Sequence, residues 1–329
     1  MQPLIVLQFD MRASPECPDS AGDRYRACID MVKWADTQPI SVVGFSEHHN
    51  TEDGFLSASL MMAMAAACVS ERIAINVSAL LLPLHEPLRV AEDIAVLDLV
   101  SKGRFMATLG LGYRELEYRT MGVDWPGRGK VFDEKLDVLL QALRREPFQY
   151  RGAEVLLNPG PASPLQSLLC VGGNSAAAAR RAARCGLIFA PPVDDPALQL
   201  AYEAECEKVG FKHGLVIFPN QPSLTLIADD PDKAWAEVGK YFLYDARAYR
   251  QWRHSSRRAY AESAADSLEE LREEGKYAIL SPAEAAAKII EKGSLNLAPL
   301  CGGMPIDTAW RSLELYAAKV VPLLDQHTM

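Results

Sequence analysis

The sequence has little positive charge and no apolar run long enough to cross a membrane. Across 329 residues, 34 Lys and Arg stand against 43 Asp and Glu, which gives a net charge of −9. Binding nucleic acid or an anionic membrane requires clustered Lys and Arg, so this balance excludes a general partner of either kind. The most apolar helical stretch, residues 57–69, is shorter than the ~20 residues that a membrane span needs. We therefore expect no nucleic-acid partner and no membrane partner.

Cysteine pairs at metal-binding or redox spacing are also missing. The seven cysteines are odd in number and never form a CxxC pattern: Cys17, Cys28, Cys68, Cys170, Cys185, Cys206 and Cys301. This usage favours free thiols in a reducing compartment over disulfides or zinc. The opening segment PLIVLQFDMR has no basic stretch before its apolar run, so it does not resemble a signal peptide. We expect a cytoplasmic protein.

Metal-binding histidine motifs are absent as well. Four of the six histidines lie far apart, without HExxH spacing: His85, His213, His254 and His327. Metal sites built from histidines on one helix need such spacing. The sequence therefore predicts no metal site.

What the sequence does contain is a regular alternation of short apolar runs and amphipathic helical stretches. Eight runs predict strands, at 3–9, 40–45, 72–83, 104–112, 167–173, 187–192, 223–230 and 294–303. Apolar strands separated by helices indicate parallel pairing with both faces of the sheet covered. Eight such units favour an α/β fold, a closed (β/α)8 TIM barrel, over an open doubly wound sheet. We expect residues 1–329 to form this single domain.

The stretch 230–280 is too long for a simple connection between a strand and a helix. We interpret it as an insertion after the seventh strand, ahead of a helix whose SPAE sequence at 281–284 matches a capping box. Its basic cluster comprises Arg247, Arg250, Arg253, His254, Arg257 and Arg258. A solvated helix face explains such a cluster, and so does a lid or partner surface over the barrel mouth.

A pair of histidines lies where chemistry belongs in such a barrel, at the carboxyl end of a strand. In SVVGFSEHHNTEDGF, an apolar strand ends on Glu47, His48 and His49. Histidine changes charge near neutral pH, so His48 on a rigid strand end is a candidate acid–base group. The alternative is a loop histidine bonded to a nearby carbonyl. Successive side chains diverge at a strand end, so we assign His49 a structural role. Asp10, after the first strand, is expected at the same mouth.

Two glycine-rich turns follow other strands. VGGNSAAAAR places Gly172, Gly173, Asn174 and Ser175 before a helix, where free backbone N–H groups suit a phosphate. An ordinary turn with an N-cap needs the same residue types, so this pattern has two interpretations. TLGLGYRELE contains the second turn, but Glu115 replaces the third glycine of the dinucleotide fingerprint. Its glycines instead let a flat ligand approach closely.

Several segments, in this order, are similar to the bacterial luciferase-like monooxygenase family. They are EHHNTEDGF, NVSALLLPLHEPLRVAEDIAVLDLVSKGRF, GLGYRELEY, MGVDW, VGGNS and PLCGG. The resemblance is good over residues 40–190 and looser at both ends. It implies a TIM barrel that binds a flavin at its mouth.

The resemblance also implies roles for individual residues. His48 occupies the place of the active-site histidine, which lies beside the flavin ring and handles protons. Ser78 and Ala79 occupy the place of a non-prolyl cis peptide that packs under the ring. Residues 173–175 match the segment that receives the flavin phosphate.

The chain departs from the luciferases after the fourth strand. Where they carry a reactive cysteine and a phosphate-binding arginine, this chain has Gly110 and Leu111. The departure argues against light emission and against the usual phosphate contact. Arg128 or Lys130 is a candidate for the missing charge.

The resemblance implies a flavin-dependent monooxygenase. We expect it to use reduced FMN (FMNH2), delivered by a flavin reductase, and O2 to oxidise a small organic substrate. An oxidoreductase that transfers a hydride with the deazaflavin coenzyme is one alternative, and a non-catalytic flavin-binding subunit is another. The family also implies a homodimer.

Overall fold

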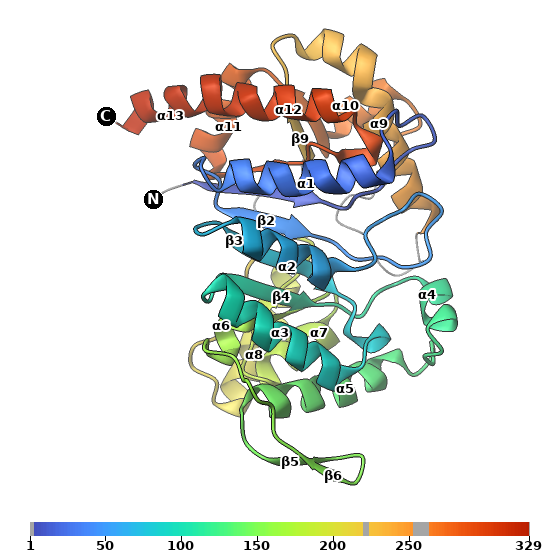
Figure 1. The fold of residues 1–329 in the computed structure, drawn as a ribbon, viewed down its shortest axis with the longest axis vertical. Helices are drawn as coiled ribbons and strands as arrows, with labels where there is room; N and C mark the ends of the chain where they lie inside the picture. Colours follow the sequence, from blue (N-terminus) through green and yellow to red (C-terminus); the bar gives the residue numbers. More distant parts are fainter. Residues whose placement is uncertain (1–2, 220–223, 253–262, 329) are drawn as a thin grey trace.

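A parallel sheet surrounded by helices forms the frame of the protein (Figure 1). The structure is a computed structural model, and it describes residues 3–219, 224–252 and 263–328. The strands of the sheet are β1 (Leu4–Phe9), β2 (Val42–Phe45), β3 (Ala74–Leu80), β4 (Phe105–Leu109), β7 (Leu169–Gly172), β8 (Ile188–Ala190), β9 (Leu224–Ile227), β10 (Tyr277–Leu280) and β11 (Ser294–Leu297). A separate hairpin consists of β5 (Phe148–Tyr150) and β6 (Ala153–Val155).

The helices alternate with the strands along the chain, as the sequence predicts. They are α1 (Ala21–Ala35), α2 (Ser59–Val69), α3 (Pro87–Ser101), α4 (Glu115–Thr120), α5 (Arg128–Leu143), α6 (Leu165–Leu168), α7 (Ala176–Arg184), α8 (Pro196–Val209), α9 (Pro231–Gln251), α10 (Leu268–Glu274), α11 (Pro282–Lys292), α12 (Ile306–Leu315) and α13 (Val321–Thr328). Shorter helical turns are η1 (Leu82–Leu84), η2 (Cys301–Gly303) and η3 (Tyr316–Val320). Helices α1, α2 and α3 lie side by side over β1 to β4, and the β5–β6 hairpin projects from one end of the molecule (Figure 1).

The nine strands pair in the order β10-β9-β11-β1-β2-β3-β4-β7-β8, and every pair is parallel. This confirms the predicted α/β class, and all eight predicted strands are present. Within the described residues, β8 and β10 are the two edges of the sheet, although Val216 adds a parallel bridge to Phe189 of β8. Closure of the barrel therefore stays a prediction.

Successive side chains along each strand point alternately to the helix-covered face and to the inner face of the sheet. On β1, Ile5, Leu7 and Phe9 are at most 1% exposed, and they belong to the main hydrophobic core. Leu7 pairs in register with Val43 and with Leu297, both equally buried, so apolar rows continue across the sheet. Burial of one such side chain contributes about 1.5–3 kcal/mol. These apolar rows fix the register between neighbouring strands. The alternate side chains of each strand therefore point to the inner face of the sheet.

Local signals set the ends of several helices. Ser20 caps α1 by accepting a hydrogen bond from the Asp23 backbone N–H, as its spacing predicts. Ser281 and Glu284 form the predicted capping box at the start of α11, with Pro282 at its first position.

The stretch 230–280 contains more regular structure than the sequence analysis predicted. It holds the long helix α9, the helix α10 and the strand β10, which pairs with β9 along its whole length. The YAIL strand escaped prediction because only four apolar residues separate the charged LREEGK from the helix start at 281. Of the basic cluster, Arg253, His254, Arg257 and Arg258 lie outside the described residues. None of the described helices has the length and apolar character that crossing a bilayer requires.

Candidate active site

The inner face of the sheet encloses a cavity of about 770 Å³. The side chains of Val6, Gln8 and Asp10 alternate along β1 to form one of its walls. The predicted site residues that line it are His48, Ser78, Ala79, Gly110, Gly172, Gly173 and Asn174. The structure thus brings the histidine after β2 and the glycine turn after β7 to one cavity. Its volume lies within the range of about 300–1,000 Å³ that is typical of small-molecule sites.

His48 is held between two side chains that follow β4. Its Nδ1 lies 2.9 Å from Oε1 of Glu117, and its Nε2 lies 3.0 Å from the hydroxyl of Tyr113. An ionised carboxylate only accepts hydrogen bonds, so Nδ1 carries the proton. In the neutral ring Nε2 is then an acceptor, and the Tyr113 hydroxyl donates to it.

Burial decides the charge state of this group of three. The desolvation of His48 lowers its pKa, although the hydrogen bond and the charge of Glu117 act in the opposite direction. Burial also disfavours the charged form of Glu117, but the hydrogen bond from His48 and further donors keep its pKa below the usual value. Burial raises the pKa of Tyr113. At neutral pH the set is therefore a phenol, a neutral imidazole and a carboxylate.

Glu117 is a fixed anchor for this set. The same Oε1 atom accepts hydrogen bonds from the His49 backbone N–H at 2.8 Å and from Arg114 at 3.0 Å. Arg114 also donates to the His49 carbonyl at 2.8 Å, and its guanidinium lies 4.1 Å from the ring centre of Trp252. These contacts join the loop after β4 to the end of β2, so His48 is held from both sides.

Glu47 organises a second buried network next to the first. Its carboxylate accepts from His49 at 3.1 Å, from His85 at 2.8 Å and from the Ser59 hydroxyl at 2.5 Å. The Leu81 backbone N–H adds a fourth donor at 3.2 Å. Burial opposes ionisation, but these donors hold the pKa of Glu47 at about 2. His49 lies outside the cavity lining and is held by Glu47, and its structural role stays a prediction.

Arg12 lies behind the cavity and is fully buried. It pairs with Asp53 and with Asp245, each at 2.7 Å. Its guanidinium also lies over two aromatic rings. Its distance is 4.4 Å to the ring centre of Tyr249, near the end of α9, and 4.3 Å to that of Trp252, the residue after α9. Tyr249 lines the cavity, and the Trp252 ring centre is 4.9 Å from that of His48. The stretch 230–280 therefore contributes to the site.

The backbone around β3 and β4 leaves space at the cavity wall. The Ser78–Ala79 peptide bond is cis, as the family resemblance implies. A Cβ atom on Gly110 would lie 2.7 Å from Cβ of Ala79, and one on Gly172 would lie 3.0 Å from a methyl of Thr108. Larger side chains at these two glycines would therefore displace their neighbours.

The turn before α7 has the N-cap that its sequence pattern suggests, but one of its four residues lies outside the cavity lining. Gly173 has φ +136°, which L side chains rarely adopt. Ser175 is the N-cap of α7, and its hydroxyl accepts from the Ala178 backbone N–H at 3.3 Å. Ser175 is not among the cavity-lining residues, so its role in phosphate binding stays a prediction.

The described lining of the cavity contains no Lys or Arg. Arg128 donates to the Trp125 carbonyl and lies over the Trp125 ring, while Lys130 is exposed beside Glu134. Neither residue reaches the cavity wall in this structure. The described lining of the cavity thus offers a phosphate backbone N–H groups and no Lys or Arg side chain.

Two groups of side chains combine potential metal ligands. Glu47, His49 and His85 form one, and Asp10, Asp245 and Cys301 form the other. In the first group, Oε1 of Glu47 already accepts hydrogen bonds from both imidazoles and from a backbone N–H, so these side chains form a hydrogen-bond network with one another. The prediction that the protein has no metal site stays a prediction.

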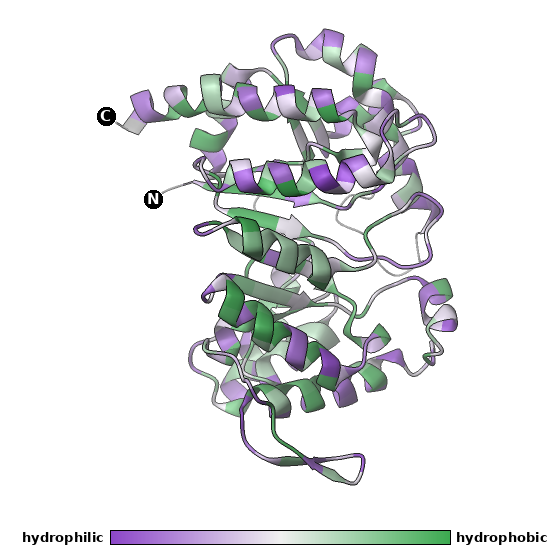
Figure 2. Cartoon of the chain, in the orientation of Figure 1, coloured by the Kyte–Doolittle hydropathy of each residue, from purple (hydrophilic) through white to green (hydrophobic). Residues whose placement is uncertain are grey.

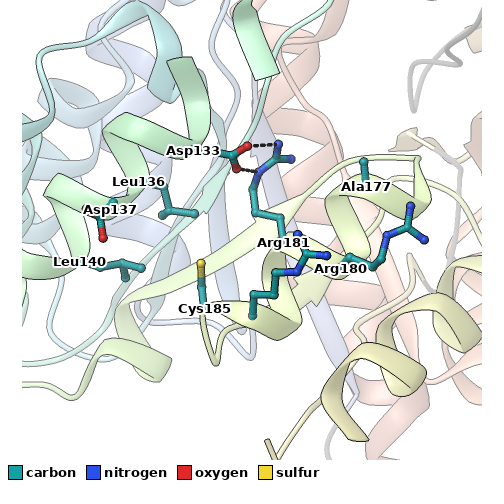
Figure 3. Close-up of a pocket in the computed structure, with 9 residues that line it drawn as sticks. Asp133, Leu136, Asp137, Leu140, Ala177, Arg180, Arg181 and Cys185 are labelled. Carbon is teal, nitrogen blue, oxygen red and sulfur yellow. Dashed lines mark hydrogen bonds and ion pairs between the residues drawn. The ribbon is translucent and has the colours of Figure 1, made fainter. Parts of the chain in front are cut away.

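A smaller hollow of about 550 Å³ lies on the outside of the molecule, between α5 and α7 (Figure 3). Leu136 and Leu140 of α5 face Arg181 and Cys185 across it, and Arg181 pairs with Asp133 (Figure 3). None of the predicted site residues lines this hollow.

Sequence analysis missed the partners of His48. Tyr113 and Glu117 belong to the GLGYRELEY segment, which was considered for its glycines and for its family resemblance but not for these two side chains. The signal comes from the structure, in which Glu117 and Tyr118 are buried although the charged residues on either side of them in α4 are exposed. An acidic residue on the buried side of a short helix calls for a partner.

Known proteins share both the sequence pattern and this architecture. Residues 1–295 match the family described as Luciferase-like monooxygenase. An uncharacterized protein of Sinorhizobium fredii is 27% identical over 46% of this chain and 43% of its own length. The alkanal monooxygenase alpha chain of the Kryptophanaron alfredi symbiont is 28% identical over 30% of this chain and 27% of its own length. The chain thus spans less than half the length of these curated relatives.

Two solved structures resemble the whole chain. The oxygenating constituent of 3,6-diketocamphane monooxygenase from Pseudomonas putida, in complex with FMN, matches with a TM-score of 0.72 and 20% identity over 98% of this chain and 99% of its own. An F420-dependent secondary alcohol dehydrogenase matches with a TM-score of 0.66 and 15% identity, over 98% and 99%. At these identities the likeness shows the fold. The chain belongs to the luciferase-like monooxygenase family of enzymes.

Proposed function

We propose that this protein is a flavin-dependent monooxygenase, which uses reduced FMN and O2 to oxidise a small organic substrate in the cavity beside His48. One observation carries the proposal. His48 is neutral, its Nδ1 is held by Glu117, and its Nε2 accepts from Tyr113 at the wall of a cavity of flavin-binding size. A neutral imidazole at the cavity wall can take a proton from a ligand and return it. The carboxylate stabilises the imidazolium that forms.

The cavity fits the cofactor on several counts. Gly110 and Gly172 keep the wall free of side chains next to the cis peptide at Ser78, where a planar ring would lie. The turn at 172–174 and the first backbone N–H groups of α7 would hold the phosphate. When bound, reduced FMN supplies the electrons with which O2 is activated.

The segment 230–280 supports the proposal as a cover of the site. Tyr249 of α9 forms part of the cavity wall, and Trp252 packs against the His48 ring. The Phe55 ring centre lies 4.8 Å from the His48 ring centre on another side. Apolar walls of this kind exclude water, which protects reactive species and strengthens the hydrogen bonds inside.

The proposal is tested by binding and by reaction with oxygen. Purified protein is titrated with FMN, reduced FMN and the deazaflavin coenzyme, and the reduced complex is then mixed with oxygenated buffer while absorbance is followed. We expect reduced FMN to bind, and the absorbance of its reaction with O2 to differ from that of free flavin. Tight binding of the deazaflavin alone would contradict the proposal.

A deazaflavin-dependent hydride transfer is the second candidate. Gly110 and Leu111 stand where the luciferases carry a cysteine and a phosphate-binding arginine, so the usual contact to FMN is missing. The F420-dependent alcohol dehydrogenase has the same fold. This function requires neither O2 nor a reductase, so the same titration separates the two candidates.

The proposed monooxygenase depends on further partners. A flavin reductase would supply the reduced FMN. The seven free thiols fit a reducing cytoplasm, in which the protein and the reductase would work.

We also propose a homodimer through α2 and the second half of α3, whose viewed face is largely apolar (Figure 2). Met61 is 75% exposed there, and Val96, Leu99 and Val100 are more than 40% exposed. Light scattering should report a dimer for the wild type and a monomer for Val100→Glu, and a monomeric wild type would refute this interface.

A further inference from the structure

A buried charge cluster at the end of β1 has one more carboxyl group than cations. Arg12 pairs with Asp53 and Asp245, and the Arg24 guanidinium donates to the carbonyls of Leu300, Met304 and Arg12. Asp10 is the third carboxyl. With Asp10 ionised, three carboxylates would therefore face two guanidinium groups.

Asp10 is the member of the cluster that reaches the cavity. It lines the wall, whereas Arg12, Asp53 and Asp245 do not. One of its oxygens accepts the backbone N–H of Arg12 at 3.0 Å, and among the described residues no Lys or Arg side chain forms an ion pair with it. Burial, together with the charge of Asp245, raises the pKa of Asp10 to about 7. In the absence of a ligand, a proton on Asp10 thus balances the cluster for part of the time.

The rest of the cavity wall favours a ligand that donates hydrogen bonds over one that accepts them. The described lining holds no Lys or Arg, and Glu47, its other acid, is already saturated with hydrogen bonds. Ser294, 4% exposed, lines the cavity with a buried hydroxyl that has no partner among the described residues. The amide oxygen of Asn76 on the same wall is likewise buried and without a described partner. The Asn76 oxygen is a buried acceptor, and the Ser294 hydroxyl can accept as well as donate, so N–H groups of a ligand would satisfy either atom.

We propose that the cavity takes an organic ammonium compound as its substrate, and that the Asp10 carboxylate binds the ammonium group. The inference rests on the proposed function, because it names the substrate class of that site. The ammonium replaces the proton that balances the three carboxyl groups. A neutral or anionic compound of the same shape leaves Asp10 without a cation, so it binds more weakly.

Binding is measured by isothermal titration calorimetry on the full chain without flavin. The probes are hexylammonium, hexanol and hexanoate, which share one apolar chain and differ in charge. We expect hexylammonium to bind at least tenfold more tightly than either of the others. Titrations at pH 7 in two buffers of different ionisation enthalpy should show release of about half a proton per site, because Asp10 is about half protonated there.

The pH dependence has a defined direction. The titratable and charged groups that face Asp10 are Arg12, Arg24, Asp245, Tyr249 and Cys301. Burial raises the pKa of Tyr249 and of Cys301, so neither loses its proton near neutrality. Affinity for hexylammonium should therefore fall about fivefold from pH 7 to pH 6, as the ionised fraction of Asp10 falls.

Asp10→Asn removes the charge and keeps an oxygen for the Arg12 backbone N–H. It should weaken hexylammonium at least tenfold, abolish proton release and leave hexanol within threefold. Asp194→Asn, which removes one exposed carboxylate after β8, should bind all three probes as the wild type does. If hexanol or hexanoate matches hexylammonium in the wild type, if no probe binds, or if Asp10→Asn leaves the preference unchanged, the inference is wrong. FMN binding is measured separately, so such a result leaves the proposed flavin chemistry to its own test.

Discussion

The two sides of the cavity are built in different ways. On the β2 side, His48 belongs to a continuous network of buried charged and aromatic side chains that includes Glu117, Tyr113 and Arg114. On the β7 side, the wall consists of backbone and small residues, with Gly172 and Gly173 leading into α7. A side-chain network can hold and move protons, whereas exposed backbone N–H groups can only bind. The difference agrees with the proposed function, in which the β2 side carries the chemistry and the β7 side binds the cofactor.

His48→Ala should have the largest effect on activity, because it removes the central member of the network. We expect turnover to fall about 10²–10⁴-fold, with FMN affinity changed little. Steady-state kinetics and flavin titration measure the two quantities. His213→Ala, at an exposed position, is the matched control. A variant with unimpaired turnover would remove His48 from the mechanism.

Glu117→Gln tests whether the network positions His48. The amide oxygen still accepts but carries no charge, so the hydrogen bonds from the His48 Nδ1–H and from Arg114 lose their ionic partner and weaken. We expect turnover to fall about 10–100-fold, the range found for carboxylates that orient a metal-bound histidine, and the pH profile of kcat to shift. Glu115→Gln alters an exposed acid of the same helix and should change neither. An unchanged pH profile would limit Glu117 to a structural role.

Lowering the pH should reduce the free energy of unfolding of the protein, because Glu47 becomes protonated. The pKa of Glu47 is about 2 in the folded protein and 4.5 ordinarily, so its ionisation stabilises the fold above pH 4.5. This contribution, about 3 kcal/mol, is lost as the pH falls from 4.5 toward 2. Denaturant unfolding of the wild type and of Glu47→Gln at pH 6, 4 and 3 measures it. Equal loss of stability in both proteins would refute the assignment.

Gly110→Ala probes the space between the two sides. The added Cβ would lie 2.7 Å from Cβ of Ala79. We expect a loss of about 1–3 kcal/mol in stability, together with weaker FMN binding, since the wall beside the cis peptide must shift. Gly129→Ala adds a methyl that meets no atom within 4 Å and should not weaken either. Normal FMN affinity in Gly110→Ala would place the ring elsewhere.

Ser175→Ala should have the smallest effect, and it sharpens the account of the β7 side. Loss of an N-cap costs about 1 kcal/mol, and if the start of α7 receives the phosphate, FMN affinity should fall as well. Ser20→Ala removes the corresponding cap of α1, far from the cavity lining. A similar melting temperature for the two variants, with FMN binding reduced only in Ser175→Ala, is the expected result. Unchanged affinity would move the phosphate site away from this turn.

Much of this organisation could be predicted from local sequence. The apolar strands, the caps at Ser20 and Ser281, and the positions of His48 and Gly172 at strand ends all follow from patterns a few residues long. Parallel strands place their carboxyl ends at one edge, so a shared cavity could be expected as well.

The partners of the site could not be predicted in this way. Glu117 meets His48 across 69 positions of the sequence, and Arg12 meets Asp245 across 233. Local patterns carry no information about such pairs, because their distance depends on how separate units pack. The strand β10 was missed for a related reason, since its four residues pair with β9 and pack into a core whose members come from distant segments.

The alternation of strands and helices, the positions of His48 and of the Gly172 turn at strand ends, and the resemblance to the luciferase-like monooxygenase family can all be found in the sequence alone. The hydrogen-bond partners of His48, the absence of an ion pair for Asp10 among the described residues and the residues that line the cavity follow from the packing of the folded chain. The two kinds of information differ in range. Periodicity and capping act over a single turn or strand, whereas the charge state of a buried group depends on everything that packs around it.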